Sequence, residues 1–271
     1  MIFRLFLLIA ITALTTTSCS TTVYYQLYKA TPVNKSNQQG NFIYEDESCK
    51  VTYNFWSEAG NAGFIFYNKT NENITINLSD SYFVLNDFAY DYFKNRIYTT
   101  SNEQSLSIDK KTTAAVQLNG LFVPLFGMQS LQKGIVHSSG SSIAITESKI
   151  VCVPAKTSKI ISEFSINELR IKNCNLLKYP SKKQVSPVNY TKDDSPLVFS
   201  NRISYNVGTG NTVKFQNEFY ISEISNHPSS EFFSIQRSKE CGESKSVNTS
   251  NYISADKFYI SYNKGVDAAK Y

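Results

Sequence analysis

Apolar and polar residues alternate along most of the chain from residue 41 onward, with the period of two that is typical of half-buried β-strands. In CKVTYNFW, residues 49–56, the apolar side chains of the first seven positions fall on one face and the polar ones on the other. ITINL, residues 74–78, and TVKFQNEFYI, residues 212–221, repeat the pattern, with Asn217 as the exception. These stretches are predicted to be strands.

Turn sequences support this prediction. EAGN at residues 58–61 separates two strand-like stretches, and GTGN at residues 208–211 separates RISYNV from TVKF. Glycine and asparagine accept the positive φ angles that tight hairpin turns need, so both sites are predicted hairpins. Further strands are expected at residues 82–85, 142–146 and 149–153, and in KTSKIISEFSI after Pro154.

Helical patterning is weak. The best helical stretch, NGLFVPLFGMQSLQK at residues 119–133, is interrupted by Pro124 and Gly127. The sequence therefore predicts an all-β fold: an antiparallel β-sandwich, immunoglobulin-like, in one or two units, with at most one short helix.

Composition shifts along the chain suggest five segments. Residues 19–40 are rich in Thr, Asn, Ser and Gln and have little apolar surface to bury, whereas residues 167–196 carry prolines and charges. The expected organisation is as follows: 1–18, signal peptide; 19–40, lipidated flexible tether; 41–166, β-sandwich domain; 167–196, linker or long loop; 197–271, C-terminal β-rich segment or second small domain.

The first 18 residues have the layout of a secretory signal, with Arg4 near the start, an apolar run from Leu5 to Leu14, and a small polar section. The apolar run is too short to cross a bilayer as a helix, which needs about 20 residues. The sequence LTTTSCS then leads into Cys19 and resembles the lipobox of bacterial lipoproteins. A strict lipobox has leucine three residues before the cysteine, where this chain has Thr16. In that family, the cysteine thiol carries a diacylglyceryl group and the chain is cut just before it.

The small net charge of the chain bears on which partners are expected. The formal net charge is +5, and it falls to +4 if Arg4 is removed with the signal. A surplus this small gives no reason to expect nucleic-acid binding, which calls for a basic stripe or patch. The longest basic grouping, Lys182-Lys183 with Lys178 nearby, lies among prolines and is interpreted as a solvated loop.

Four cysteines remain after Cys19, an even number that fits disulfides in an exported chain. Cys174 and Cys241 lie in polar, loop-like surroundings and form the candidate disulfide pair, although four cysteines allow three complete pairings. Cys49 and Cys152 fall in strand-like stretches and are interpreted as core thiols.

Catalytic and metal signals are weak. The two histidines are His137, followed by SSGSS, and His227, which precedes a proline. The chain has no G-x-S-x-G elbow and no cysteine or histidine spacing that fits a zinc site. We therefore expect no enzyme activity, no cofactor and no metal.

Aromatic residues are the one compositional excess, with 18 Tyr and 18 Phe. Tyrosine is common in strands, so β-structure alone accounts for much of this excess. The alternative is a platform of exposed tyrosines for sugars, because a tyrosine ring combines an apolar face with a polar tip.

The runs CSTTVYYQLYKATPVNK, YNKTNENITINL, VCVPAKTSKIISEFSINE and NEFYISEI resemble an uncharacterised family of Bacteroides lipoproteins over nearly the whole chain. The resemblance implies an exported lipoprotein with lipid on Cys19 and implies no activity. Because STTVYYQLYK has no acidic residue after the cysteine, it favours an outer-membrane anchor facing the periplasm over exposure on the cell surface.

The sequence thus predicts a membrane-anchored envelope lipoprotein that acts as a non-catalytic binding or structural module and contacts another envelope protein. A glycan-binding lipoprotein is the alternative. Three or more coplanar exposed aromatic rings along a groove would favour sugar, whereas a flat apolar patch or a free sheet edge would favour protein. A deep pocket that holds a histidine beside a carboxylate would favour an enzyme.

Replacing Cys19 by alanine is expected to release soluble or unprocessed protein, because acyl chains on this residue would hold the chain to the bilayer. Membrane fractionation and mass spectrometry of the amino-terminal peptide provide the measurement. Normal processing with unchanged membrane association in Cys19→Ala would contradict the prediction.

Overall fold

The structure is a computed structural model, and it describes residues 22–33, 42–101, 115–118, 121–124, 142–241, 243–265 and 269–270. The described chain is mostly β, and its sheets are antiparallel apart from one two-stranded pair, β14 (Arg170–Ile171) with β21 (Ala269–Lys270). This agrees with the alternating pattern of the sequence.

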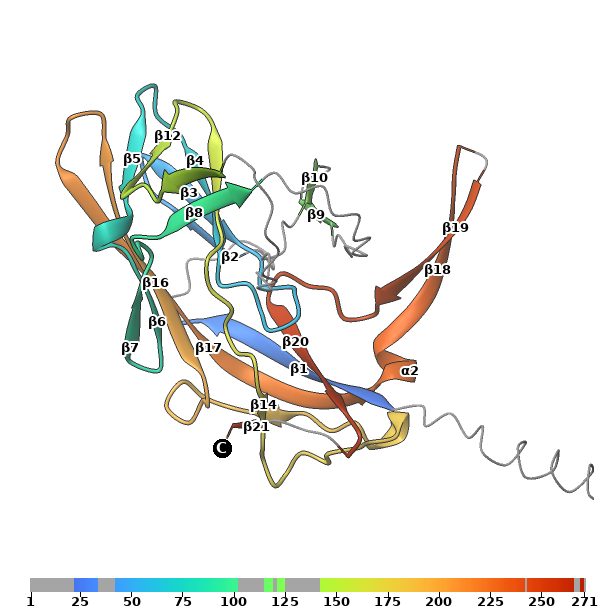
Figure 1. Cartoon of the computed structure of the whole chain (residues 1–271). Coiled ribbons are helices and arrows are strands. Elements are labelled where there is room, and N and C mark those ends of the chain that lie inside the picture. The colour runs from blue at the N-terminus through green and yellow to red at the C-terminus, as the bar shows by residue number, and fades with distance from the viewer. Residues whose placement is uncertain are drawn as a thin grey trace, which may run out of the picture.

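The main sheet is a curled half-barrel (Figure 1). Six strands lie side by side in the order β12, β5, β16, β17, β1, β20; β15 also pairs with β17, β6 with β16, and β7 with β6. Their bounds are β1 (Val23–Pro32), β5 (Ile74–Asn77), β6 (Tyr82–Leu85), β7 (Phe88–Asp91), β12 (Ile150–Val153), β15 (Val188–Asn189), β16 (Val198–Val207), β17 (Thr212–Pro228) and β20 (Lys257–Asn263).

A second sheet has four strands in the order β13, β4, β3, β2, and three further pairs stand as two-stranded sheets, β8–β11, β9–β10 and β18–β19. Their bounds are β2 (Phe42–Glu45), β3 (Cys49–Tyr53), β4 (Phe64–Asn68), β8 (Ile97–Ser101), β9 (Ala115–Leu118), β10 (Leu121–Pro124), β11 (Ser142–Thr146), β13 (Ser158–Ile161), β18 (Phe233–Glu240) and β19 (Glu243–Ser250).

The described residues contain one short α-helix, α2 (Ser229–Phe232), and two 3₁₀ turns, η1 (Leu78–Asp80) and η2 (Lys182–Gln184). The helix lies away from the expected stretch, residues 119–133. Within that stretch, Leu121–Pro124 is strand β10 and the other positions lie outside the described residues. Pro124 fits there because the strand sits in a two-stranded pair and not in the middle of a sheet.

The expectation of a flexible tether at residues 19–40 is wrong for Val23–Pro32, which forms strand β1. Val23–Pro32 forms a ten-residue strand between β17 and β20, with Tyr24 opposite Pro228 on one side and Tyr262 on the other. Tyr28 and Gln26 are fully buried. The segment is polar in composition, but its amide groups pair on both edges and its tyrosines enter the core, so it is an integral strand.

Strand β17 joins the parts of the main sheet because it is 17 residues long. Its first half pairs with β16 and its second half with β1, with Phe219 opposite both Phe199 and Pro32. The predicted hairpin at residues 208–211 connects β16 to β17, and Gly208 has the positive φ expected there, 51°.

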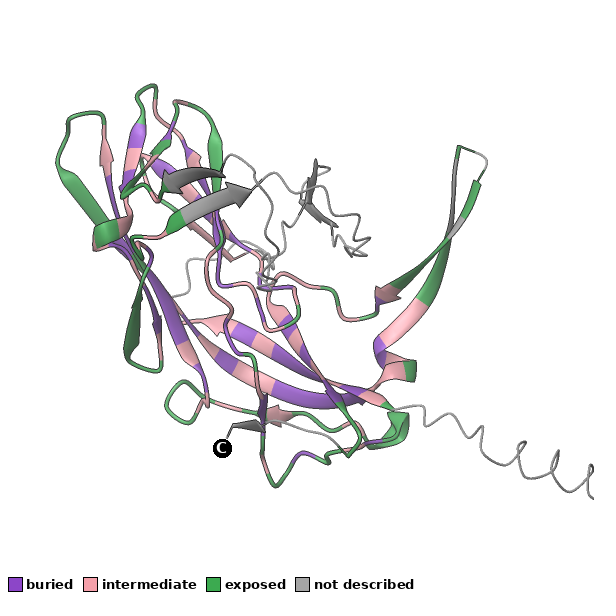
Figure 2. Ribbon diagram, in the orientation of Figure 1, coloured by how far each residue is buried: buried purple, intermediate pink, exposed green. Residues whose placement is uncertain are grey.

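Aromatic rings fill the space between the main sheet and the four-stranded sheet. Phe55 meets Phe199 at a centroid distance of 5.3 Å and Phe219 at 5.0 Å, and Tyr53 meets Phe219 at 5.1 Å, all nearly edge to face. These rings belong to one large core cluster. In Figure 2, the buried residues are purple and are spread along the strands of the main sheet. Much of the tyrosine and phenylalanine excess is therefore core, as strand propensity alone would predict.

The predicted all-β antiparallel architecture is confirmed, whereas an immunoglobulin-like sandwich is not. Strands from the two expected β-rich segments share the main sheet: β5 and β12 come from residues 41–166, and β16, β17 and β20 from residues 197–271. Residues 167–196 run between them as a long excursion that contains β14, η2 and β15.

Candidate functional site

The β18–β19 hairpin, called the arm below, stands off the body (Figures 1 and 2). Its strands pair only with each other among the described strands. The body holds the start of the arm through an aromatic cluster, called the arm root, in which Phe232 stacks on Tyr25 at 4.4 Å and Trp56 lies parallel to Phe232 at 6.2 Å. The members of the arm root are Tyr25, Leu27, Trp56, Phe232, Phe233, Tyr252 and Tyr259.

A buried polar group lies beside the arm root. Ser225 Oγ is 2.8 Å from His227 Nε2, and His227 Nδ1 is 3.8 Å from Glu231 Oε2. Tyr252 donates a hydrogen bond to the other Glu231 oxygen at 2.8 Å. Neither His227 Nδ1 nor Glu231 Oε2 has a hydrogen-bond partner among the residues that the structure describes. Burial is the main cause that lowers the pKa of His227 below its ordinary value of 6.5, and the positive charge of Lys257 adds to it, while Glu231 acts in the opposite direction.

The serine contacts the histidine, and the histidine lies next to the carboxylate, as in the triad of a hydrolase. Such a triad acts only if a substrate can reach the serine hydroxyl. Ser225 is 3% exposed and His227 is 3% exposed. Neither residue lines any of the hollows described below. In this conformation the Ser225 hydroxyl is not open to a substrate, and the group acts as a packed polar contact at the root of the arm.

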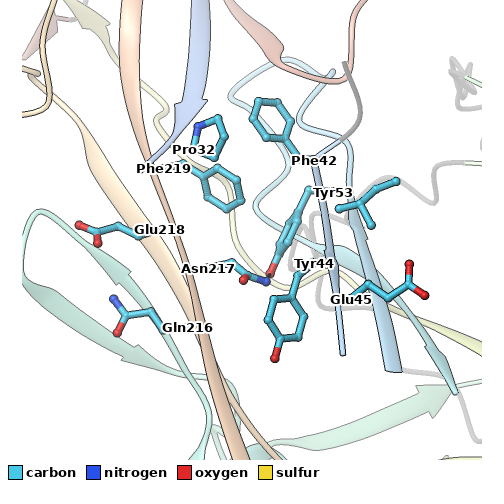
Figure 3. Close-up of a pocket in the computed structure, with 10 residues that line it drawn as sticks. Pro32, Phe42, Tyr44, Glu45, Tyr53, Gln216, Asn217, Glu218 and Phe219 are labelled. Atoms are coloured by element: carbon cyan, nitrogen blue, oxygen red, sulfur yellow. Dashed lines mark hydrogen bonds between the residues drawn. The ribbon is translucent and has the colours of Figure 1, made fainter. Parts of the chain in front are cut away.

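A cleft of about 280 Å³ lies between β2 and β17 (Figure 3). Phe42 and Phe219 meet edge to face at 5.3 Å across it, and Tyr44 stacks on Phe215 at 4.5 Å. Burial is the first cause that raises the pKa of Tyr44 to about 12, and the neighbouring Asp46 adds to it. The lining thus combines four aromatic rings with polar residues, among them Glu45 and Glu218.

The polar groups of the cleft are already paired. Asn217, the exception to the apolar pattern of β17, donates to the Tyr53 hydroxyl at 2.8 Å. Glu45 pairs with Lys69 and Glu218 with Lys192, and Figure 3 shows both carboxylates pointing away from the cleft. Pro32 and Phe42, which both line the cleft, are joined by residues 33–41, and residues 34–41 lie outside the described part, so we assign no ligand to the cleft.

A second hollow, of about 470 Å³, lies between the β6–β7 hairpin and residues 163–169. Phe83 and Phe164 stack at 5.1 Å, and Tyr90 lies 6.2 Å from Phe164 at an angle of 50°. Phe88 is 71% exposed and Tyr90 is 45% exposed. Because Phe88 and Tyr90 are two residues apart on β7, they share the face that carries Phe83 and Leu85.

Charged groups close one side of this hollow. Glu163 accepts from Arg96 at 2.5 Å and from Lys94 at 3.0 Å, and Lys94 Nζ also lies 4.6 Å from the centre of the Phe164 ring. Arg96 binds Glu147 as well, at 2.5 Å. These charges pair with one another, and the hollow is lined by the rings of Phe83, Tyr90 and Phe164 together with charged and polar residues.

The structure describes some of the predicted site residues and leaves others out. Cys19 and His137 lie outside the described residues. Cys174 and Cys241 are exposed and unbonded in this structure, and Cys241 lies at the tip of the arm, which extends away from the body; the candidate disulfide stays a prediction. Cys49 is buried as expected, but Cys152 is exposed because it lies on the outward face of β12.

The described residues form neither a metal-binding cluster nor a membrane-spanning helix. No group of three or more His, Cys, Asp or Glu side chains among them is arranged to hold a metal ion. Within the same residues, no helix has the length and apolar character that crossing a membrane requires.

The arm root and the two hollows were missed by reasoning from the sequence. Each joins residues that are far apart in the chain, such as Tyr25 with Phe232 or Phe42 with Phe219. One usable signal was present, since PSSEFF places two adjacent phenylalanines after a possible helix start at residue 229.

Comparisons with known protein families, with curated proteins and with solved structures found no match to this chain.

The burial of His227 predicts a pH effect. Its lowered pKa means that the unfolded chain binds the proton more readily, so the stability that neutral His227 contributes is present above pH 6.5 and is lost as the pH falls through the folded-state pKa. We expect the free energy of unfolding, measured in urea at pH 7.5 and pH 5.5, to fall less in His227→Gln than in the unmodified protein.

The matched control is His137→Gln, which changes the second histidine of the chain. It should follow the unmodified protein at both pH values. If His227→Gln and the unmodified protein lose stability in parallel, His227 does not cause the acid sensitivity.

Proposed function

We propose that this protein is a lipid-anchored, non-catalytic binding module of the cell envelope, held to the outer membrane through Cys19 on the periplasmic side, which contacts another envelope protein through the arm. The anchor is supported by the order of Arg4, the apolar run and LTTTSCS in the sequence. The observation that carries the binding role is the arm itself, a long hairpin with exposed faces.

A hairpin of this kind favours a partner for energetic reasons. An isolated two-stranded hairpin is at best marginally stable in water, yet each arm strand runs for eight residues. Ile235 is 68% exposed and Val247 is 52% exposed, and their register places them on opposite faces. The outer edges of a two-stranded sheet also present backbone groups to which another strand can add. The arm thus offers both apolar side chains and sheet edges.

The test is a pair of charge substitutions. Ile235→Asp with Val247→Asp should weaken capture of the partner from solubilised envelope at least about tenfold, because burying two carboxylates in an interface is strongly unfavourable. The captured protein is then identified by mass spectrometry, and the loss is measured again with the purified pair.

Ile150→Asp with Ile160→Asp is the control, since both isoleucines are about half exposed on the body, at 54% and 51%. The control should bind like the unmodified protein. An equal loss in both variants, or no loss in the arm variant, would reject the arm as the binding surface.

The hollow beside β7 supports a second candidate, the binding of a neutral oligosaccharide. Tyr90, which lines the hollow, and Phe88 on the same strand face present exposed rings, and Glu168 lines the hollow as a polar group. Aromatic faces combined with polar rims suit a sugar, which has both apolar and polar surfaces. The rings are not coplanar, however, so we rank this candidate below the arm.

If sugar binds here, Tyr90→Ala should weaken binding of glucose, mannose or N-acetylglucosamine oligomers, because the apolar face of the exposed Tyr90 ring would no longer contact the sugar. Isothermal titration gives the affinity. Tyr82→Ala is the control, since Tyr82 lies on the other face of the same hairpin. No binding by any of these oligomers, or equal losses in both variants, would remove this candidate.

A further inference from the structure

We infer that a basic face at the beginning of β1 binds the anionic headgroups of the membrane to which the protein is tethered. This inference rests on the proposed lipid anchor at Cys19, and it names a second contact with the same bilayer. It also changes the interpretation of Lys178, Lys182 and Lys183, which the sequence alone suggested to be a solvated loop.

The connection between Cys19 and the main sheet is short. Cys19 precedes Val23, the first residue of β1, by four positions, so the chain between them spans at most about 14 Å when fully extended. Because β1 is an integral strand, a lipid on Cys19 leaves little freedom for the body. The end of the sheet where β1 begins is therefore held close to the headgroups.

Tyr179, Lys264 and Gly265 lie at the end of the sheet where β1 begins. Tyr24 packs on Tyr179 at a centroid distance of 5.1 Å, and the Lys264 amide donates to the Thr22 carbonyl at 2.9 Å. The Gly265 amide in turn donates to the Tyr179 hydroxyl at 3.0 Å. In Figure 1, the yellow segment from the middle of the chain lies beside the first residues of β1.

Buried hydrogen bonds fix this segment on the strand. The Gln26 side chain, fully buried in β1, donates to the Ile171 carbonyl at 3.0 Å and accepts from the Ile171 amide at 2.7 Å. Asn226 donates to the Leu177 carbonyl at 3.0 Å. The segment is therefore a fixed part of the surface beside β1.

The segment beside the start of β1 is basic. Residues 169–192 contain six basic residues and no acidic one, although the whole chain has a surplus of only five. Lys178, Lys182 and Lys183 are exposed, as is Lys264 at the end of β20. Lys178 Nζ and Lys264 Nζ lie 5.1 Å and 5.9 Å from the centre of the Tyr179 ring, so the two positive charges are close to the same side chain. Leu177, 52% exposed, adds an apolar side chain to the same face.

A membrane surface fits these features better than a soluble anion. Each lysine near an anionic bilayer contributes attraction that decays within a Debye length, about 8 Å at physiological salt. The short connection keeps the basic face near that range. A lipid anchor combined with a basic patch is also a stronger attachment than the lipid alone.

The test uses the chain from residue 19 with Cys19→Ser, so that no lipid contributes. We expect it to sediment with vesicles of equal parts phosphatidylglycerol and phosphatidylcholine, but not with phosphatidylcholine alone. The triple variant Lys178→Glu, Lys182→Glu, Lys183→Glu should lower partitioning at least about a hundredfold, since each lysine accounts for about fivefold.

The control is Lys149→Glu, Lys156→Glu, Lys159→Glu, which makes the same change in net charge. These exposed lysines lie around β12 and β13, at the opposite end of the body from the start of β1 (Figure 1). The control should keep most of the binding. Circular dichroism melts of both variants verify that they fold.

Absence of binding to the anionic vesicles, or equal losses in the two triple variants, would overturn the inference. The anchor is decided separately, by the mass of the amino-terminal peptide from the membrane-extracted protein. Vesicle binding therefore tests the basic face, and the mass of the peptide tests the lipid anchor, so the two hypotheses can be rejected independently.

Discussion

The backbone pairing of β1 on both edges is the constraint on which the rest of the structure depends. This strand hydrogen-bonds to β17 on one side and to β20 on the other, so the beginning of the described chain closes against its last third. Without it, β20 would lose its only strand partner among the described residues, and Tyr25 would leave the aromatic cluster that holds the arm. The curled sheet, the arm and the basic face all take their positions from this one strand.

Much of the fold could be predicted from the sequence, because period-two alternation reports directly on half-buried strands. The stretch at residues 142–146 is strand β11 with the same bounds, and the turn at residues 208–211 joins β16 to β17. Strand β1 could not be predicted in this way. None of its ten residues is exposed and both of its faces carry buried side chains, so a polar composition with tyrosines conceals a central strand whose partners lie about two hundred residues away.

The candidate sites were harder to predict for the same reason. Alternation shows which face of a strand is buried, but not which distant strand will lie opposite. Asn217 illustrates the limit: in the sequence it interrupts the apolar face of β17, and in the fold it donates to Tyr53 in the other sheet. The arm shows a second limit, since its strands are rich in serine and charge and have little apolar patterning. The basic residues of the long excursion were visible in the sequence, but their position beside β1 was not.

The central position of β1 also has a mechanical consequence. A force that pulls Val23 along the strand axis would load the hydrogen bonds to β17 and β20 together, in shear, so many bonds must yield at once. A pull on an edge strand perpendicular to its axis would instead open the bonds one after another, like a zipper. The end of the molecule that we propose to be tethered therefore has the bonding geometry that best resists extraction under tension.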